Sequence, residues 1–153
     1  MPLYLVQHGK SQPKEQDPAQ GLSPEGRAEV QRIAEVAKNY RLPVTLIRHS
    51  GKKRALETAE IFAAALQPAQ GLQEMAGINP LDDVTLIASQ LVPAQNLMLV
   101  GHLPFMERLA AYLITKNTEL KVIRFQNGGI VCLDRDPEGG PWFIKWTLMP
   151  HIG

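Results

Sequence analysis

The 153-residue chain contains a single cysteine and has neither a long apolar run nor an excess of one charge. Because Cys132 is alone, an internal disulfide is excluded, and we expect its thiol to be a small buried apolar group. No window approaches the unbroken apolar length that crosses a bilayer. The N-terminus also lacks the pattern of a secretory signal, since polar residues from Gln7 onward interrupt its apolar run. We therefore expect a soluble cytoplasmic protein.

Charge and size narrow the class of protein further. Sixteen basic and fifteen acidic residues give a formal net charge of +1, which provides no general attraction for nucleic acid or an anionic membrane. Any anion site must therefore be local. The length and the apolar fraction of 44% suit one globular domain over residues 1–153, which we expect to be a monomer.

Apolar runs and helical spacing alternate along the chain. Apolar runs predict strands at residues 3–6, 44–47, 97–100, 120–125, 129–134 and 142–148, with a loop or short strand at 72–78. Helical spacing predicts helices at about residues 24–40, from 53 to before Pro68, from 79–80 to 91, and 103–116. Residues 126–128 are predicted to form a hairpin turn, and the last strand to lie at an edge. The alternation is typical of an α/β protein with a mainly parallel sheet, covered on both faces and extended by an antiparallel portion.

Three polar segments follow directly after predicted strands. His8 follows the first strand, the Ser50–Arg54 loop follows the second, and His102 follows the run at 97–100. Parallel strands place their carboxyl ends at one edge of a sheet, where ligands bind in open α/β folds. We therefore expect these three segments to converge at one site.

Four motifs in chain order resemble those of the histidine phosphatase superfamily, and within it the small bacterial phosphohistidine phosphatases of the SixA type. The family's strand followed by Arg-His-Gly corresponds to Leu5–Gly9, and its Leu-Thr-x-x-Gly helix start to Leu22–Gly26. Its Ser-Pro-x-x-Arg-Ala-x-Gln-Thr segment corresponds to Ser50–Thr58, and its second-histidine segment to Val100–Pro104. The resemblance implies a phosphoglycerate mutase-like three-layer α/β/α sandwich.

The resemblance also implies a role for each site residue. His8 is the expected nucleophile, forming a phosphohistidine that water hydrolyses. Arg54 is expected to bind the phosphoryl oxygens through its planar guanidinium. His102, protonated in the complex, would stabilise charge in the transition state. Phosphoryl transfer depends on positioning and charge, so we expect neither metal nor cofactor.

Other residues near these motifs receive weaker assignments. Gln7, Gly9 and Ser50 complete the candidate phosphate-binding set, although we favour Ser50 as the cap of the helix that contains Arg54. Lys10, Lys52 and Lys53 are expected to be solvated. His49 and His151 are expected to be surface residues.

The chain departs from the family pattern at one important residue and at two less important ones. Gln7 replaces the usual arginine before the nucleophile, so a neutral donor stands where the family has a charged one. Gly51 and Glu57 replace the proline and glutamine of the arginine segment, and neither is expected to contact phosphate. A general acid is not evident: Glu74 resembles the family's acid in position, but we do not expect it to act as one.

Three functions remain open at this stage. The first is a phosphatase acting on protein phosphohistidine, whose leaving imidazole is readily protonated without a strong acid. The second is a phosphatase of a small-molecule phosphoester. The third is a phosphate-binding module with little turnover, suggested by Gln7.

Overall fold

The computed structural model describes residues 2–91 and 96–153. Six strands form one sheet in the order β3-β2-β4-β1-β5-β6. The strands are β1 (Leu3–Gln7), β2 (Leu46–His49), β3 (Leu72–Glu74), β4 (Leu97–Gly101), β5 (Ile130–Asp134) and β6 (Phe143–Leu148). The first four are mutually parallel, whereas β5 pairs antiparallel with both β1 and β6. The sheet is thus mainly parallel, with an antiparallel edge as predicted.

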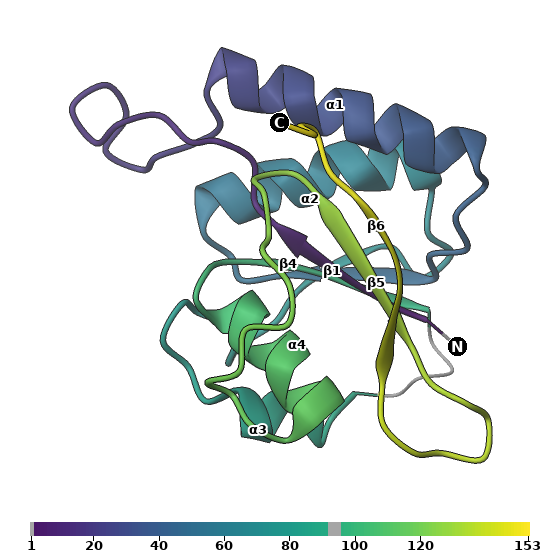
Figure 1. Cartoon of the computed structure of the whole chain (residues 1–153). Helices are drawn as coiled ribbons and strands as arrows, with labels where there is room; N and C mark the ends of the chain where they lie inside the picture. The colour runs from purple at the N-terminus through teal and green to yellow at the C-terminus, as the bar shows by residue number, and fades with distance from the viewer. Residues whose placement is uncertain (1, 92–95) are drawn as a thin grey trace.

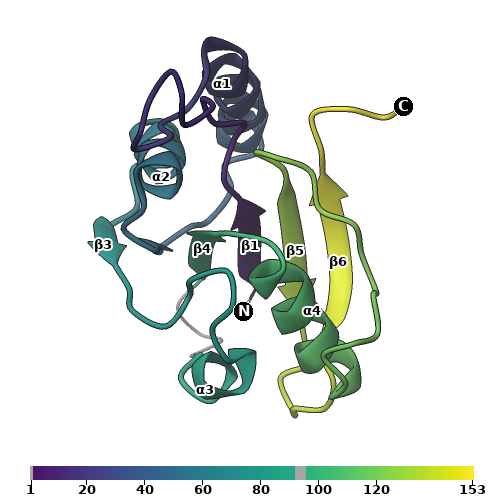
Figure 2. The same ribbon diagram turned by 90° about the vertical axis from the view of Figure 1, so that its left-hand side faces the viewer.

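Four helices cover the two faces of the sheet (Figures 1 and 2). They are α1 (Pro24–Asn39), α2 (Lys53–Leu66), α3 (Val84–Ala88) and α4 (Phe105–Thr115). The apolar stripes of α1 and α2 pack on one face with Tyr4, Val6 and Met98, and α3 and α4 pack on the other with Leu5 and Leu99. Alternate residues of the central strands therefore feed two cores, which accounts for their continuous apolar runs.

The helix starts follow local chemistry. Ser23 caps α1, with its hydroxyl accepting a hydrogen bond from the Gly26 amide, and Pro24 occupies the first helical position. Helix α3 is shorter than predicted: Asp83 is its cap, and residues 79–82 form turns before it. The Asp82 carboxylate accepts the Asn79 amide and favours a turn there, whereas the Asp83 carboxylate accepts the Thr85 amide and so starts the helix.

The predicted strand at 120–125 and its hairpin with 129–134 are wrong. Strand β5 pairs with β1 on one side and β6 on the other, so neither of its edges is left for a preceding strand. Residues 121–126 instead run as an irregular segment from α4 toward β5. The hairpin joins β5 to β6, and β6 lies at the edge of the sheet as predicted.

The cysteine prediction is confirmed, since Cys132 is buried in the core shared by α1 and α2. Within residues 2–91 and 96–153, none of the helices has the length and apolar character that crossing a membrane requires.

Candidate functional site

The carboxyl ends of β1, β4 and β2 lie at one edge of the sheet and deliver the predicted site residues. Strand β4 pairs in parallel with β1 on one side and with β2 on the other, with Gln7 opposite Gly101 and His49 opposite Val100. His8 and His102 therefore leave adjacent strands, and Ser50–Arg54 follows the next one. Figures 1 and 2 show the same edge, where β1 and β4 end beside the start of α2.

His8 has a defined tautomer. Its Nδ1 lies 2.7 Å from the carbonyl oxygen of Gly9, which can only accept, so Nδ1 bears the hydrogen. Its Nε2 lies 3.3 Å from Nε of Arg54, which can only donate. Burial, together with the charge of Arg54, lowers the pKa of His8 to about 4 against the opposing hydrogen bond to Gly9. The imidazole is consequently neutral near pH 7, with the Nε2 lone pair directed toward the guanidinium.

His102 lies beside His8, with ring centroids 5.1 Å apart. Its Nε2 is 2.6 Å from the Ser50 hydroxyl, whereas its Nδ1 is buried and has no hydrogen-bond partner among residues 2–91 and 96–153. Burial, then His8 and the charges of Arg54 and Lys52, lower the pKa of His102 to about 3. A phosphoryl dianion in the site would oppose these effects and favour the protonated ring expected in the complex.

Ser50 is not the cap of α2. Lys52 occupies the cap position, and no side chain caps the helix. The Ser50 hydroxyl instead contacts His102 and accepts a 3.4 Å hydrogen bond from the Lys52 amide. The loop turns away from helical geometry at Gly51, whose φ of 90° favours glycine and is closed to the family's proline.

Two residues outside the predicted set support the nucleophile. Thr58 is fully buried; its hydroxyl donates to the Arg54 carbonyl oxygen at 2.7 Å and accepts from the Gly9 amide at 2.9 Å. The side chain of Asn127 donates to the His8 carbonyl oxygen at 2.9 Å. Thr58 lies within the arginine motif, which could have drawn attention to it, but Asn127 is 119 residues from His8 and has no sequence signal beyond its turn-like context.

Gln7 and Gly9 flank His8 in different environments. The Gly9 amide is already bound to Thr58, and an added Cβ at Gly9 would press on Val30 and Leu22. Gly9 thus allows the close packing that positions its neighbour. The side-chain Oε1 of Gln7 is buried and has no hydrogen-bond partner among the residues that the structure describes. A buried acceptor without a partner is costly, and only the side-chain NH₂ of Gln7 could donate to an anion.

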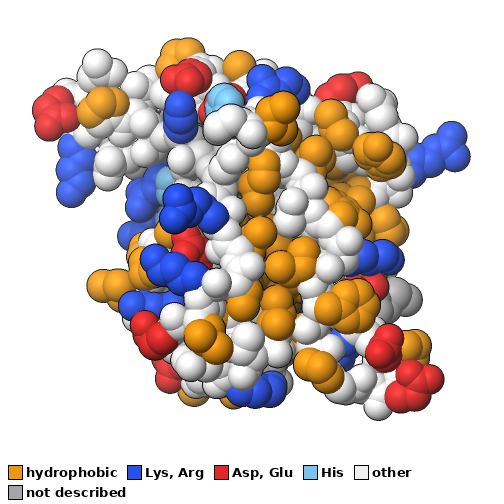
Figure 3. Space-filling model, in the orientation of Figure 1, with side chains coloured by type: hydrophobic (Ala, Val, Ile, Leu, Met, Phe, Trp, Pro, Cys, Tyr) orange, Lys and Arg blue, Asp and Glu red, His pale blue; other side chains and the backbone are white. Residues whose placement is uncertain are grey.

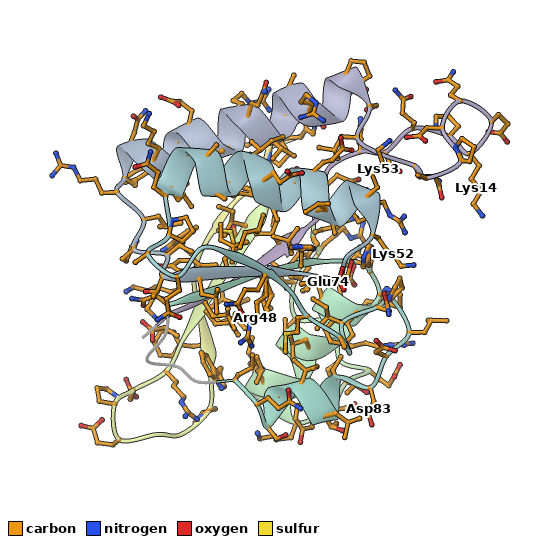
Figure 4. The ribbon with its side chains drawn as sticks, turned by 180° about the vertical axis from the view of Figure 1, so that it is seen from behind. Lys14, Arg48, Lys52, Lys53, Glu74 and Asp83 are labelled. Carbon is orange, nitrogen blue, oxygen red and sulfur yellow. The ribbon has the colours of Figure 1, made fainter. Side chains whose placement is uncertain are left out.

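Basic side chains gather around this edge of the molecule. Figure 3 shows Lys and Arg side chains on the side where the parallel strands end, and Figure 4 shows Lys52, Lys53 and Glu74 together on that side from behind. Lys10 pairs with Glu25 at 2.9 Å and Lys53 with Asp17 at 3.0 Å, and all four residues are at least partly solvent-exposed. Such pairs contribute little stability, in keeping with the solvated role predicted for these lysines.

Glu74 ends β3, is exposed, and its carboxylate lies against Gly51 where a Cβ would otherwise stand. Glycine at this position therefore allows the carboxylate to approach the loop. That Glu74 does not act as the general acid stays a prediction.

The prediction of a surface residue is wrong for His49 and confirmed for His151. His49 is buried, and its Nδ1 accepts the Gly51 amide at 3.0 Å, so it shapes the loop before Arg54. His151 is exposed but has a partner, because its Nε2 bonds the buried carboxylate of Glu29. In the part of the chain that the structure describes, no group of three or more His, Cys, Asp or Glu side chains could hold a metal ion.

Known proteins with a similar sequence or fold indicate the family of this chain. The profile of the Histidine phosphatase superfamily (branch 1) matches residues 3–79, which include His8 and Arg54. A search of curated protein sequences found no match. The fold is similar to that of the protein histidine phosphatase SixA complexed with tungstate, at a TM-score of 0.84 and 21% identity over 98% of this chain and 97% of that one.

Two further solved structures share the fold. One, from Agrobacterium tumefaciens, bears the SixA name and gives a TM-score of 0.77 and 25% identity over 97% of each chain. The other is the alpha-ribazole phosphatase of Shigella flexneri, with a TM-score of 0.76 and 16% identity over 100% of this chain and 98% of that one. With the profile match covering half of its length and a site built from the family's motifs, the chain belongs to the histidine phosphatase superfamily.

Proposed function

We propose that the protein is a phosphohistidine phosphatase that uses His8 as its nucleophile and needs no metal ion. The observation that supports this most directly is the state of His8. Its ring is neutral, Gly9 holds the hydrogen on Nδ1, and the Nε2 lone pair faces Arg54, the residue best suited to bind the phosphoryl group. A nucleophile positioned beside an oxyanion-binding guanidinium is what in-line phosphoryl transfer requires.

The reaction has two steps. Nε2 of His8 attacks phosphorus, the P–N bond of the substrate breaks, and the leaving imidazole takes up a proton. Arg54 binds the phosphoryl oxygens, and the protonated ring of His102 donates to another oxygen as negative charge develops. Water then attacks phosphorus, the bond to His8 breaks, and inorganic phosphate leaves. Gln7, Gly9 and Ser50 complete the phosphate-binding set in this proposal, Ser50 by positioning His102.

Protein phosphohistidine is favoured as the substrate by the leaving group and by the fold. The P–N bond breaks without the strong general acid that an alkyl phosphate needs, so the reaction does not depend on Glu74, whose carboxylate lies against Gly51. The SixA structures that share the fold point in the same direction. We also propose that the protein acts in the cytoplasm as a monomer. Its single cysteine, Cys132, is a buried free thiol, which is in keeping with a reducing compartment.

A trapping experiment tests the mechanism. Rapid quenching with a phosphohistidine-containing protein should yield an acid-labile, alkali-stable phosphoenzyme in the wild type and none in His8→Ala. A control at the exposed His151, as His151→Asn, should still form the intermediate, because His151 bonds Glu29 and contacts none of the three proposed catalytic residues. Normal turnover by His8→Ala would overturn the assignment of the nucleophile.

A small-molecule phosphoester is the second candidate, because the alpha-ribazole phosphatase has the same fold. The ratio of kcat/KM for a phosphohistidine protein to kcat/KM for a panel of phosphometabolites separates the two. A higher value for any phosphometabolite would favour the second candidate. If the protein turned over neither kind of substrate but still bound tungstate, the remaining candidate would be a phosphate-binding module.

A further inference from the structure

A groove begins next to His102. Leu103 and Glu107, from the start of α4, form one wall, and residues 121–125 form the other, enclosing about 580 Å³. A smaller hollow of about 250 Å³ continues it past Arg108 and shares Leu103, Glu107 and Lys121. We call the two together the α4 groove. Leu103 follows His102 in the chain, so one wall of the groove starts beside a residue of the proposed phosphoryl site.

The 121–125 wall has an unused backbone. Within residues 2–91 and 96–153, no hydrogen bond joins the N–H or C=O groups of Lys121–Phe125 to another residue. The sequence of this segment is nevertheless that of a strand, rich in Val, Ile and Phe, which is why a strand was predicted there. Strand β5 has no free edge for it, and Figures 1 and 2 show the segment passing outside the sheet between α4 and β5. Backbone groups of this kind can pair with an added strand.

The segment is firmly anchored rather than loose. Phe125 is 5% exposed in the core beneath α4, and Val122 and Ile123 pack against the same core. Lys121 and Arg124 point outward, are exposed, and have no ion-pair partner among the described residues. Arg108 on the facing helix has none either, so the cations along the groove outnumber Glu107 and Glu119. A ligand with acidic side chains would match this charge.

We propose that the α4 groove binds an extended, acidic segment next to the phosphohistidine of a protein substrate, by strand addition along Lys121–Phe125. This proposal rests on the proposed function, because the phosphoryl site supplies the anchor at one end. Backbone pairing would provide affinity independent of sequence, and Lys121 and Arg124 would select acidic neighbours. A small phosphometabolite would not reach the groove.

The test uses two fluorescent ten-residue peptides, each with a phosphonate mimic of phosphohistidine and flanked by Glu or by Lys. Anisotropy should show the wild type binding the Glu peptide about tenfold more tightly than the Lys peptide, with a preference that weakens as salt rises. Lys121→Glu should abolish the preference. Lys38→Glu makes the same charge change on the remote, exposed end of α1 and should retain it. Both variants should hydrolyse p-nitrophenyl phosphate as the wild type does.

A second variant tests how much the backbone N–H groups of the 121–125 wall contribute to peptide binding. Val122→Pro removes one N–H and should weaken both peptides together; if it fails to fold, the Lys121 result still decides the proposal. Equal binding of the Glu and Lys peptides by the wild type overturns the groove while leaving phosphohistidine hydrolysis intact. A preference for Glu without any phosphohistidine hydrolysis instead upholds the groove and overturns the proposed function. A shift in oligomeric state of Lys121→Glu without peptide would identify the occupant as a second copy and overturn the proposal.

Discussion

At Gln7 we expect a substitution that stabilises the fold to weaken anion binding. Its Oε1 is buried without a partner among the described residues, and an unsatisfied buried acceptor costs about 1–3 kcal/mol. Gln7→Met preserves the length of the side chain and removes the acceptor. We expect it to raise the free energy of unfolding by about 1 kcal/mol without ligand. The same variant should bind tungstate more weakly, because the amide can no longer donate to the anion.

Gln7→Arg should have the opposite pair of effects. A charge-assisted hydrogen bond contributes about 1.5–3 kcal/mol, against about 0.5–1.5 kcal/mol for a neutral one. The difference of about 1.2 kcal/mol predicts roughly eightfold tighter tungstate binding. A second guanidinium near Arg54 should also lower stability in the absence of an anion, through desolvation and like-charge repulsion.

Two measurements check this reasoning. Calorimetric titration with tungstate gives the affinity, and urea unfolding with and without tungstate gives the stability. Gln31→Arg is the control for net charge, since Gln31 is exposed on α1. If Gln7→Met binds tungstate as tightly as the wild type and is no more stable, Gln7 does not face the anion and the reasoning fails.

Three further predictions concern pH and packing. His8 has a folded pKa of about 4, below its ordinary value of about 6.5, so its contribution to stability is complete above about pH 6.5 and declines toward pH 4. An NMR titration should give the low pKa. Between pH 7 and pH 5, His8→Gln should lose less unfolding free energy than the wild type. Thr58→Val leaves the buried Gly9 amide unpaired and should cost about 1–3 kcal/mol of unfolding free energy, with reduced kcat. Helix propensity alone would make Gly26→Ala stabilising. We expect it instead to lower the free energy of unfolding in urea by roughly 1–3 kcal/mol, because the added Cβ would overlap the Lys10 carbonyl oxygen.

Each of these has a contrary outcome. A His8 titration near 6.5 would mean that the ring is solvated. A Thr58→Val protein as stable as the wild type would show that the Gly9 amide finds another partner; Thr147→Val, exposed on β6, is the matched control. A stabilised Gly26→Ala would show that the Lys10 loop moves aside at little cost.

The candidate site could be predicted in outline because parallel strands share an edge. Once apolar runs ending in His8, in the Ser50–Arg54 loop and in His102 are recognised as parallel strands, convergence of the three follows from the geometry of the sheet. The family motifs strengthened the assignment, and the α/β architecture followed from the alternation of runs. These are local signals, and a single sequence contains them.

Only the tertiary structure decided what depends on contacts between distant residues. The pairing of β5 with β1 and β6 left residues 121–125 without a strand partner, although their own propensity favours one. The hydrogen bonds from Asn127 to His8 and from Gly9 to Thr58 join positions far apart in the sequence. The depressed pKa of His8 arises mainly from desolvation by the packed chain around it, which is a property of the fold rather than of any local stretch.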